Sequence, residues 1–326
     1  MGKLIRKATG LTVGVATLLA GLVLPMTASA ESASPIDASP IIHYSFDNAL
    51  TSKTIANEGS AANSDATLSG DATVANGQIN LTGSQTISVP TTAIAGKKDV
   101  TVSIWLKNNY GNGNTAAAYI GAAKTGNYPA NGYWLLNPAN PSGYAKSVMT
   151  NATAADPNNS PWGTEVGPGS TNAATTGTKA TSDLALYTTV ISGTNSTMSF
   201  YLNGKQVGDV TYTIPAGGLT NYGDLVAYIG KSSYADPNSK LDVDDYAVYD
   251  TAISAADVTK LYDAQVLDKA EAAVKAAVPA SATEDFALPT SAAGVSVAWK
   301  SDNAAIAVDN ATGKATVTRP AATAAD

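Results

Sequence analysis

The chain has 326 residues, no cysteine and a formal net charge of −7. Without cysteine there is neither a disulfide framework nor thiolate chemistry of any kind. An acidic chain with few lysine and arginine residues also matches nucleic acid poorly, because phosphate binding depends on basic side chains. The length leaves room for about two domains.

The N-terminus has the pattern of a secretory signal peptide over residues 1–30. Its positive start, apolar run and A-x-A cleavage motif are Lys3, Arg6 and Lys7, then Ala8 to Leu24, then Ala28-Ser29-Ala30. The alternative is an uncleaved membrane anchor. Cleavage removes three positive charges and no negative one, so the net charge of −7 becomes −10. We expect a secreted protein, extracellular or associated with a cell surface of Gram-positive type, with no membrane contact after cleavage.

Residues 31–40 are a polar, proline-containing stretch that we interpret as a flexible leader. Short apolar segments separated by turn residues follow, and they predict an all-β sandwich or barrel. These segments are Ile42 to Asp47, Leu68 to Gly70, Ile79 to Leu81, Ile87 to Pro90, Asp99 to Lys107 and Leu186 to Ile191.

The stretch from Met198 to Leu261 is the most informative part of the chain. Ser199 to Leu202 alternates as a strand, and Asn203-Gly204 supplies the positive φ of a two-residue hairpin turn before a returning strand over Lys205 to Val210. Leu241 to Tyr249 alternates as a further strand. Ser254 then has the pattern of a helix N-cap, with Asp257 in the place of the capping-box carboxylate.

In this order, these segments resemble the concanavalin A-like, laminin-G-like jelly roll over residues 41–266. The resemblance implies a rigid β-scaffold that most often binds a carbohydrate, with an aromatic side chain packed between the sheets on the strand that holds Trp105. The segment from Asn108 to Asp183 is longer than in a minimal member, so the family pattern assigns no site there.

The composition changes after this region. Residues 263–277 are rich in Ala, Lys and Glu, and they predict a helix that ends before Pro279. The motifs L-P at Leu288, V-x-W-x-S at Val297 and R-P at Arg319 resemble a bacterial Ig-like module. Only three or four strands are predicted where such a sandwich needs about seven. We therefore interpret residues 267–326 as a helical linker and an incomplete Ig-like domain, as in secreted glycosidases of arabinanase or xylosidase type, and expect a catalytic domain downstream.

Catalytic chemistry has little to build on in this chain. A retaining glycosidase needs two carboxylates beside the scissile bond. The family's E-x-D-x-x-E cluster is absent, and the five glutamates are dispersed along the sequence. His43 is the sole histidine, which we interpret as a strand residue with its hydrogen bonds satisfied. We predict no catalytic site, the alternative being carboxylates that converge from distant loops.

The resemblance implies a structural calcium ion that links the first strand to a turn and to the Asp-Asp strand. Its ligands would come from Asp47, Asn57, Gly59, Asp244 and Asp245. Adjacent strand residues point to opposite faces, so at most one of the last two is a direct ligand. The alternative is that these groups cap turns or face water.

Sugar binding needs an exposed aromatic ring together with polar groups for the hydroxyls. The long insert offers Trp162, Tyr128, Tyr144, Tyr110 and Glu165 as carbohydrate-binding candidates. Trp162 is the strongest because it lies between Pro161 and Gly163 in a predicted loop. Trp105 and Trp134 lie in apolar runs and are predicted core residues. The alternative for Trp162 is a ring that covers the edge of the sandwich.

The leading hypothesis is a non-catalytic, lectin-like region that targets a secreted multidomain glycosidase to a polysaccharide or oligosaccharide. The rival is a structural or adhesive domain of a bacterial surface protein, which further Ig-like repeats and a wall anchor in a longer chain would favour.

Overall fold

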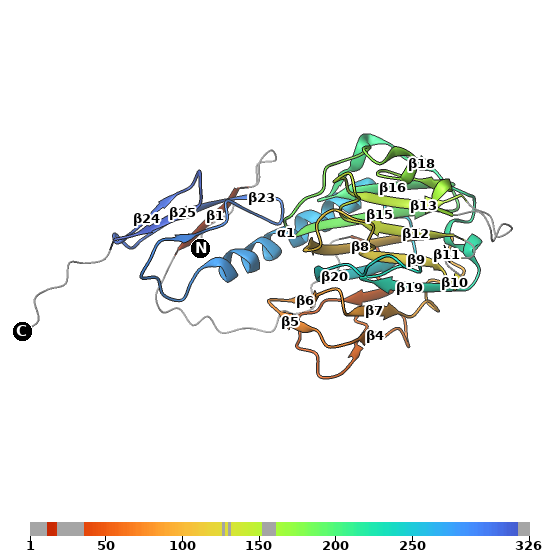
Figure 1. Cartoon of the computed structure of the whole chain (residues 1–326), viewed down its shortest axis with the longest axis horizontal. Coiled ribbons are helices and arrows are strands. Elements are labelled where there is room, and N and C mark those ends of the chain that lie inside the picture. The colour runs from red at the N-terminus through yellow and green to blue at the C-terminus, as the bar shows by residue number, and fades with distance from the viewer. Residues whose placement is uncertain (1–11, 18–35, 126–127, 130–131, 152–160, 319–326) are drawn as a thin grey trace, which may run out of the picture. The chain divides into compact units, whose positions relative to one another are not determined.

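The computed structural model describes residues 12–17, 36–125, 128–129, 132–151 and 161–318 (Figure 1). The chain divides into two compact units. One is Ser34–Tyr262, and the other combines Met1–Ala33 with Asp263–Asp326. The first unit is a sandwich of two antiparallel sheets, which confirms the predicted all-β class.

One layer of the sandwich is an eight-stranded sheet with the order β14-β13-β12-β9-β19-β7-β4-β3. In that order its strands are Glu165–Val166, Lys146–Thr150, Tyr133–Asn137, Ala118–Ala122, Leu225–Ile229, Thr86–Val89, Ala66–Ser69 and Thr54–Ile55. Two short strands, β10 (Lys124–Thr125) and β11 (Tyr128–Pro129), pair with each other. The 3-10 helices η1 (Pro161–Thr164), η2 (Thr171–Ala173) and η4 (Gly218–Tyr222) lie in the connections.

The other layer is a nine-stranded sheet whose main path is β17-β16-β15-β8-β20-β6-β5. Along that path the strands are Lys205–Gln206, Thr197–Leu202, Ala185–Ser192, Asp99–Asn108, Leu241–Tyr249, Gln78–Leu81 and Thr73–Ala75. β18 (Tyr212–Thr213) pairs with β16, and β2 (Ile42–Tyr44) pairs with β20. The predicted strand Leu241 to Tyr249 is confirmed residue for residue.

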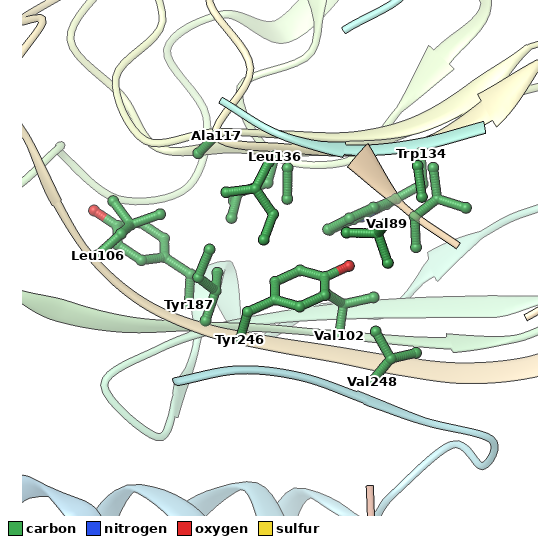
Figure 2. Packing of buried hydrophobic residues seen from close by; sticks show 14 of the residues in the cluster. Val89, Val102, Leu106, Ala117, Trp134, Leu136, Tyr187, Tyr246 and Val248 are labelled. Atoms are coloured by element: carbon green, nitrogen blue, oxygen red, sulfur yellow. The ribbon is translucent and has the colours of Figure 1, made fainter. Parts of the chain in front are cut away.

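The core lies between the two sheets, where every second side chain of each strand points inward. Figure 2 shows this contact, with Trp134 and Leu136 of β12 facing Tyr246 and Val102 of the opposite sheet. All four are at most 1% exposed, so this layer is tightly closed to water. Trp134 is thus a core residue, as predicted.

Trp105 is equally buried but lies elsewhere than expected. Its neighbours Ile104 and Leu106 point into the core, so Trp105 points to the outer face of its sheet. There its ring stacks on Tyr262 with 5.9 Å between centroids. The prediction that this aromatic packs between the sheets is wrong, because strand alternation gives the inward positions to its two neighbours.

The predicted Asn-Gly hairpin is confirmed, with φ of 51° at Asn203 and 73° at Gly204. The returning strand is shorter than the predicted Lys205 to Val210. β17 ends at Gln206 and continues as η3 (Val207–Asp209), where Gly208 has a φ of 76° that no strand residue adopts.

The predicted N-cap is also confirmed. The backbone N–H of Asp257 donates to Ser254 Oγ at 3.2 Å, and Ser254 Oγ donates to Asp257 Oδ2 at 2.8 Å. Instead of a short helix and a separate second helix, the chain forms one helix, α1 (Ala255–Ala277). Neither glycine nor proline occurs in this range, so nothing interrupts the backbone hydrogen bonding.

The second unit contains two three-stranded sheets within the described residues. One has the order β1 (Thr12–Thr17), β23 (Val295–Lys300), β22 (Ser291–Ala292), and the other β21 (Phe286–Ala287), β25 (Lys314–Val317), β24 (Ile306–Asp309). β1, which pairs in parallel with β23, comes from the predicted signal peptide. Trp299 of the V-x-W-x-S motif is buried, and its Nε1–H donates to Pro289 O at 2.7 Å. In the described part of the chain, no helix has the length and apolar character required to span a membrane.

Replacing Ile104 by alanine tests the core. Ile104 is fully buried at the centre of the nine-stranded sheet, so Ile104→Ala should lower the free energy of unfolding by about 2–5 kcal/mol. Lys107→Ala, at an exposed position of the same strand, should change it by less than about 0.5 kcal/mol. Urea unfolding followed by tryptophan fluorescence measures both, and equal effects would contradict the assignment of the core.

Candidate functional site

The outer face of the eight-stranded sheet carries a second set of large side chains. Because Trp134 and Leu136 point into the core, Tyr133 and Leu135 must point outward on the same strand. They form an outer cluster with side chains from neighbouring strands and from the connection after β19. Its members are Ala116, Tyr119, Tyr133, Leu135 and Val148, with Val226, Tyr228 and Tyr234 packed against them.

A cavity of about 690 Å³ lies on this face. Its lining includes residues of strands β12, β13 and β14, of η1 and η2, and of the 230–239 loop between β19 and β20. Charged, hydroxyl and aromatic side chains are among those that line it, namely Tyr133, Lys146, Trp162, Glu165, Thr171, Tyr234 and Asp236. We call this cavity the first hollow. Its volume is in the usual range for a small-molecule site, roughly 300–1,000 Å³.

A buried carboxylate organises one wall of the first hollow. The Glu165 side chain is only 2% exposed. Its Oε1 accepts a 2.7 Å hydrogen bond from Tyr133 Oη, and its Oε2 accepts two 2.9 Å bonds from the backbone N–H and the Oγ1 of Thr171. Lys146 Nζ lies 2.7 Å from the same Oε2. Three separate segments are thereby held around one anionic group.

Two groups near this carboxylate have displaced pKa values. Burial, reinforced by the negative charge of Glu165, raises the pKa of Tyr133 well above its usual value, so the phenol stays protonated and keeps donating. Partial desolvation raises the pKa of Asp236, against the opposing effect of the Lys146 ammonium. Lys146 therefore pairs with the deeply buried Glu165 and also favours the charged form of Asp236.

Aromatic rings also line the first hollow. Tyr234 packs edge-on against Tyr133, with 5.4 Å between centroids and an angle of 87°. It also meets Trp162 at 6.0 Å and 62°. Trp162 is held in η1, directly before the strand that carries Glu165. Rigid rings and polar groups therefore face one space, as recognition of an amphipathic ligand requires.

Asn140 fixes the loops at the rim. Its Nδ2 donates to Gly169 O at 3.1 Å and to Ala174 O at 2.7 Å. Its Oδ1 accepts from the backbone N–H groups of Ser142 and Tyr144, both at 3.0 Å. The amide is thus engaged with backbone on both sides, and its role is to hold the rim in place.

Of the predicted sugar-binding residues, the structure brings Trp162 and Glu165 together in the first hollow. Tyr110 and Tyr144 lie outside its lining, Tyr110 against Gly113 and Tyr144 beneath the Lys179 ammonium at 3.9 Å. Tyr128 belongs to β11, but its side chain lies outside the described residues. Sequence reasoning missed Lys146, Tyr234 and Asp236. The Gly and Ser residues before Tyr234 predict a loop, and this loop setting is the sequence feature that could have identified Tyr234 as a candidate.

The proposed calcium ligands divide into two groups. A Cβ built at Gly77 would lie 3.3 Å from Asp47 Oδ1 and 3.9 Å from Asp244 Oδ2, so these two carboxylates converge at one glycine. Asp244 is 2% exposed. This convergence of carboxylate oxygens fits a calcium ion, which takes six to eight oxygen ligands including carbonyls and water. Among the described residues, however, no group of three or more His, Cys, Asp or Glu side chains is placed to hold a metal.

The side chain of Asn57 is engaged within the Asn57–Gly59 turn and with the strand beside it. Asn57 Oδ1 accepts from the backbone N–H of His43 at 2.8 Å and of Gly59 at 3.1 Å, and Asn57 Nδ2 donates to Ala61 O at 2.8 Å. A Cβ at position 59 would approach Ile41 O to 2.5 Å, so close packing accounts for the glycine.

Asp245 likewise belongs to a different cluster. It lies at a β-bulge of β20 with a φ of 41°, and its Oδ1 is 2.9 Å from His43 Nε2. The histidine is thus a strand residue with a hydrogen-bond partner, as predicted.

Residues 81–259, more than half of the chain, match the family model Laminin_G_3, described as the concanavalin A-like lectin/glucanases superfamily. The chain belongs to this superfamily. The jelly-roll fold predicted from the order of the strands is therefore confirmed. A comparison with curated proteins finds no matching sequence.

Several solved structures are similar to part of this chain. One is domain 4 of AbnA, a GH43 extracellular arabinanase from Geobacillus stearothermophilus in complex with arabinotriose. Its identity to this chain is 19% and its TM-score 0.47, with 69% of this chain and 98% of that one covered. Another is the receptor binding domain of botulinum neurotoxin mosaic serotype C/D, at 18% identity and a TM-score of 0.45, covering 70% of this chain and 51% of that one. The Trypanosoma rangeli sialidase matches at 13% identity and a TM-score of 0.47, over 71% of this chain and 33% of the sialidase.

Removing the cation beside Glu165 tests the buried network. The Lys146 and Glu165 side chains are only 13% and 2% exposed, so Lys146→Met leaves a buried carboxylate without its counter-charge. The free energy of unfolding should fall by about 3–5 kcal/mol. Lys205→Met, at an exposed position, is the matched control and should change stability by less than about 0.5 kcal/mol. A wild-type urea midpoint in Lys146→Met would contradict the ion pair.

Proposed function

We propose that this chain is the non-catalytic carbohydrate-binding region of a secreted multidomain glycosidase. The observation that carries the proposal is the first hollow, where Trp162, Tyr234 and Tyr133 surround a space that also contains Lys146 and Asp236. A sugar ring has apolar C–H faces and a rim of hydroxyl groups. Aromatic rings match the faces, while ammonium and carboxylate groups match the hydroxyls.

The charges of the first hollow favour a neutral sugar. Among the described residues, its lining contains one cation, Lys146, and two carboxylates, Glu165 and Asp236. Glu165 already neutralises the ammonium at 2.7 Å. A uronate or a sulfated sugar would meet no uncompensated positive charge and would pay the cost of its own desolvation. We therefore propose a neutral polysaccharide or oligosaccharide.

The contacts of Glu165 support a positioning role. Both of its oxygens accept hydrogen bonds from protein donors. A general acid or a nucleophile must instead present its carboxylate to the substrate. In this proposal Glu165 orients Lys146 and Tyr133, and the tethered enzyme supplies the chemistry. Binding would then raise the local substrate concentration for a catalytic domain on the same chain.

Secretion, the Ig-like character of the second unit and a downstream catalytic domain are parts of the same proposal. The buried Trp299 with its bond to Pro289 O supports the Ig-like assignment. Residues 1–11 and 18–30 of the signal peptide, and Arg319-Pro320 of the Ig-like motif, lie outside the described residues.

Glycan titration with a Trp162 variant tests the binding function. Isothermal titration with arabinan, xylan, galactan and mucin glycans should show binding to a neutral glycan and none to polygalacturonate. Trp162→Ala should weaken the binding by about tenfold, because a ring contact of this kind contributes about 0.5–1.5 kcal/mol. Tyr110→Ala, a predicted ligand outside the first hollow, should bind like the wild type. No binding to any of these glycans at millimolar concentration would refute the proposal and favour the structural or adhesive role.

We also propose a structural calcium ion bound by Asp47 and Asp244, with backbone carbonyls and water as the remaining oxygen ligands. Both carboxylates lie close to Gly77, where a bound cation would offset the repulsion between their charges. The ion would tie the segment after β2 to β20.

Calcium should therefore stabilise the fold. Adding millimolar calcium to EDTA-treated protein should raise the Tm, because a ligand bound only to the native state shifts the unfolding equilibrium. Asp244→Asn should abolish this rise in Tm. Asp245→Asn is the control, because Asp245 is the neighbouring residue and bonds to His43, and this variant should retain the rise. A calcium shift that survives in Asp244→Asn would rule out the proposed site.

A further inference from the structure

A second hollow lies beside the first on the outer face of the eight-stranded sheet. It has a volume of about 280 Å³ and is lined by Tyr228, Lys231, Ser232, Ser233, Tyr234 and Asn238. Tyr234 lines both hollows. The two spaces are therefore neighbours on either side of one side chain, which the 230–239 loop supplies.

The wall between the hollows is held firmly in place. Gly230 N–H donates to Ala117 O at 2.9 Å, and Ser239 N–H donates to Gly230 O at 2.8 Å, which closes the base of the loop. At the tip, the Tyr234 ring packs against Tyr133 and Trp162. A ligand thus meets two preformed spaces, which reduces the ordering cost of binding.

A row of aromatic rings connects the floors of the two hollows. Tyr228 of β19 lies opposite Tyr119 of β9 in the sheet register, with 6.2 Å between ring centroids. Tyr119 in turn stacks on Tyr133 of β12 at 5.8 Å. One end of this row lines the second hollow, and the other end lines the first.

The second hollow differs from the first in its chemistry. Lys231 Nζ lies 4.1 Å from the centroid of the Tyr228 ring, so a cation covers a ring face that a sugar would otherwise use. The remaining lining is rich in hydroxyl groups, with Asn238 as an amide. The second hollow therefore suits the hydroxyls of a sugar, whereas the first also offers exposed ring surface.

We infer that one oligosaccharide chain occupies both hollows, with one part against Trp162 and Tyr234 and a further part against Tyr228 and Lys231. This inference rests on the proposed function, since it assigns the second hollow as an additional subsite of the same carbohydrate site. It specifies the ligand class as an extended neutral oligosaccharide. A monosaccharide or a disaccharide would fill only the first hollow.

Affinity as a function of chain length tests this inference on the full chain. Isothermal titration would use arabino-, xylo- and galacto-oligosaccharides from the disaccharide to the hexasaccharide. In the preferred series, the affinity of the hexasaccharide should exceed that of the disaccharide by about tenfold. This is the increment expected for hydrogen bonds between the sugar and the charged Lys231. Lys231→Ala should remove the increase and leave disaccharide affinity unchanged, while Trp162→Ala should weaken binding at every length.

Two further variants keep the test decisive. Tyr228→Ala removes the other side of the second hollow and should reproduce the loss of length dependence. Tyr212→Ala, a partly buried tyrosine on the nine-stranded sheet, is the matched control and should behave like the wild type. Binding that is independent of length, and unaffected by Lys231→Ala, would overturn the second subsite while the proposed function stands. Absence of binding to every series would overturn both.

Discussion

Alternation along the strands of the eight-stranded sheet is the constraint on which the candidate site depends. β12 and β9 each give every second side chain to the core, and the positions between them must face outward. In β12 this places Trp134 and Leu136 inside and Tyr133 and Leu135 outside. A shift of one residue in register would exchange these sets and destroy core and site together. The same packing that stabilises the sandwich therefore fixes the outer aromatic cluster.

The buried carboxylate of Glu165, at the edge of this face, has an unfavourable desolvation free energy that its bonding partners offset. An isolated ionised carboxylate in a nearly dry environment would be strongly destabilising. Glu165 avoids this through Tyr133, Thr171 and Lys146. Those partners belong to β12, to η2 and to β13, so neutralising one charge also assembles three segments of the wall. Here the requirements of stability and of site geometry are met by the same contacts.

Local patterns in the sequence were sufficient for much of the fold. The Asn203-Gly204 turn, the Ser254 cap and the Leu241–Tyr249 strand each depend on residues close in the chain, and each was predicted correctly. Trp105 was misplaced because alternation alone does not say which face of a strand is the core.

The candidate site was only half predictable for a related reason. Trp162 and Glu165 are near each other in the sequence, and their loop setting drew attention to them. Tyr234 and Asp236 reach the first hollow from a loop about seventy residues further on, through a strand order in which β19 lies beside β9. Lys146 has no distinctive neighbours in the sequence, and its importance comes from the contact with Glu165.

The 230–239 loop has a consequence for how this scaffold diversifies. Because Ser239 bonds back to Gly230, the loop closes at its own base. Such a segment can change in length or composition with little disturbance to the sandwich. Since Tyr234 of this loop lines both hollows, exchanging this one segment would change the size of the two spaces and the division between them. The shape of this outer face is then separable from the stability of the core.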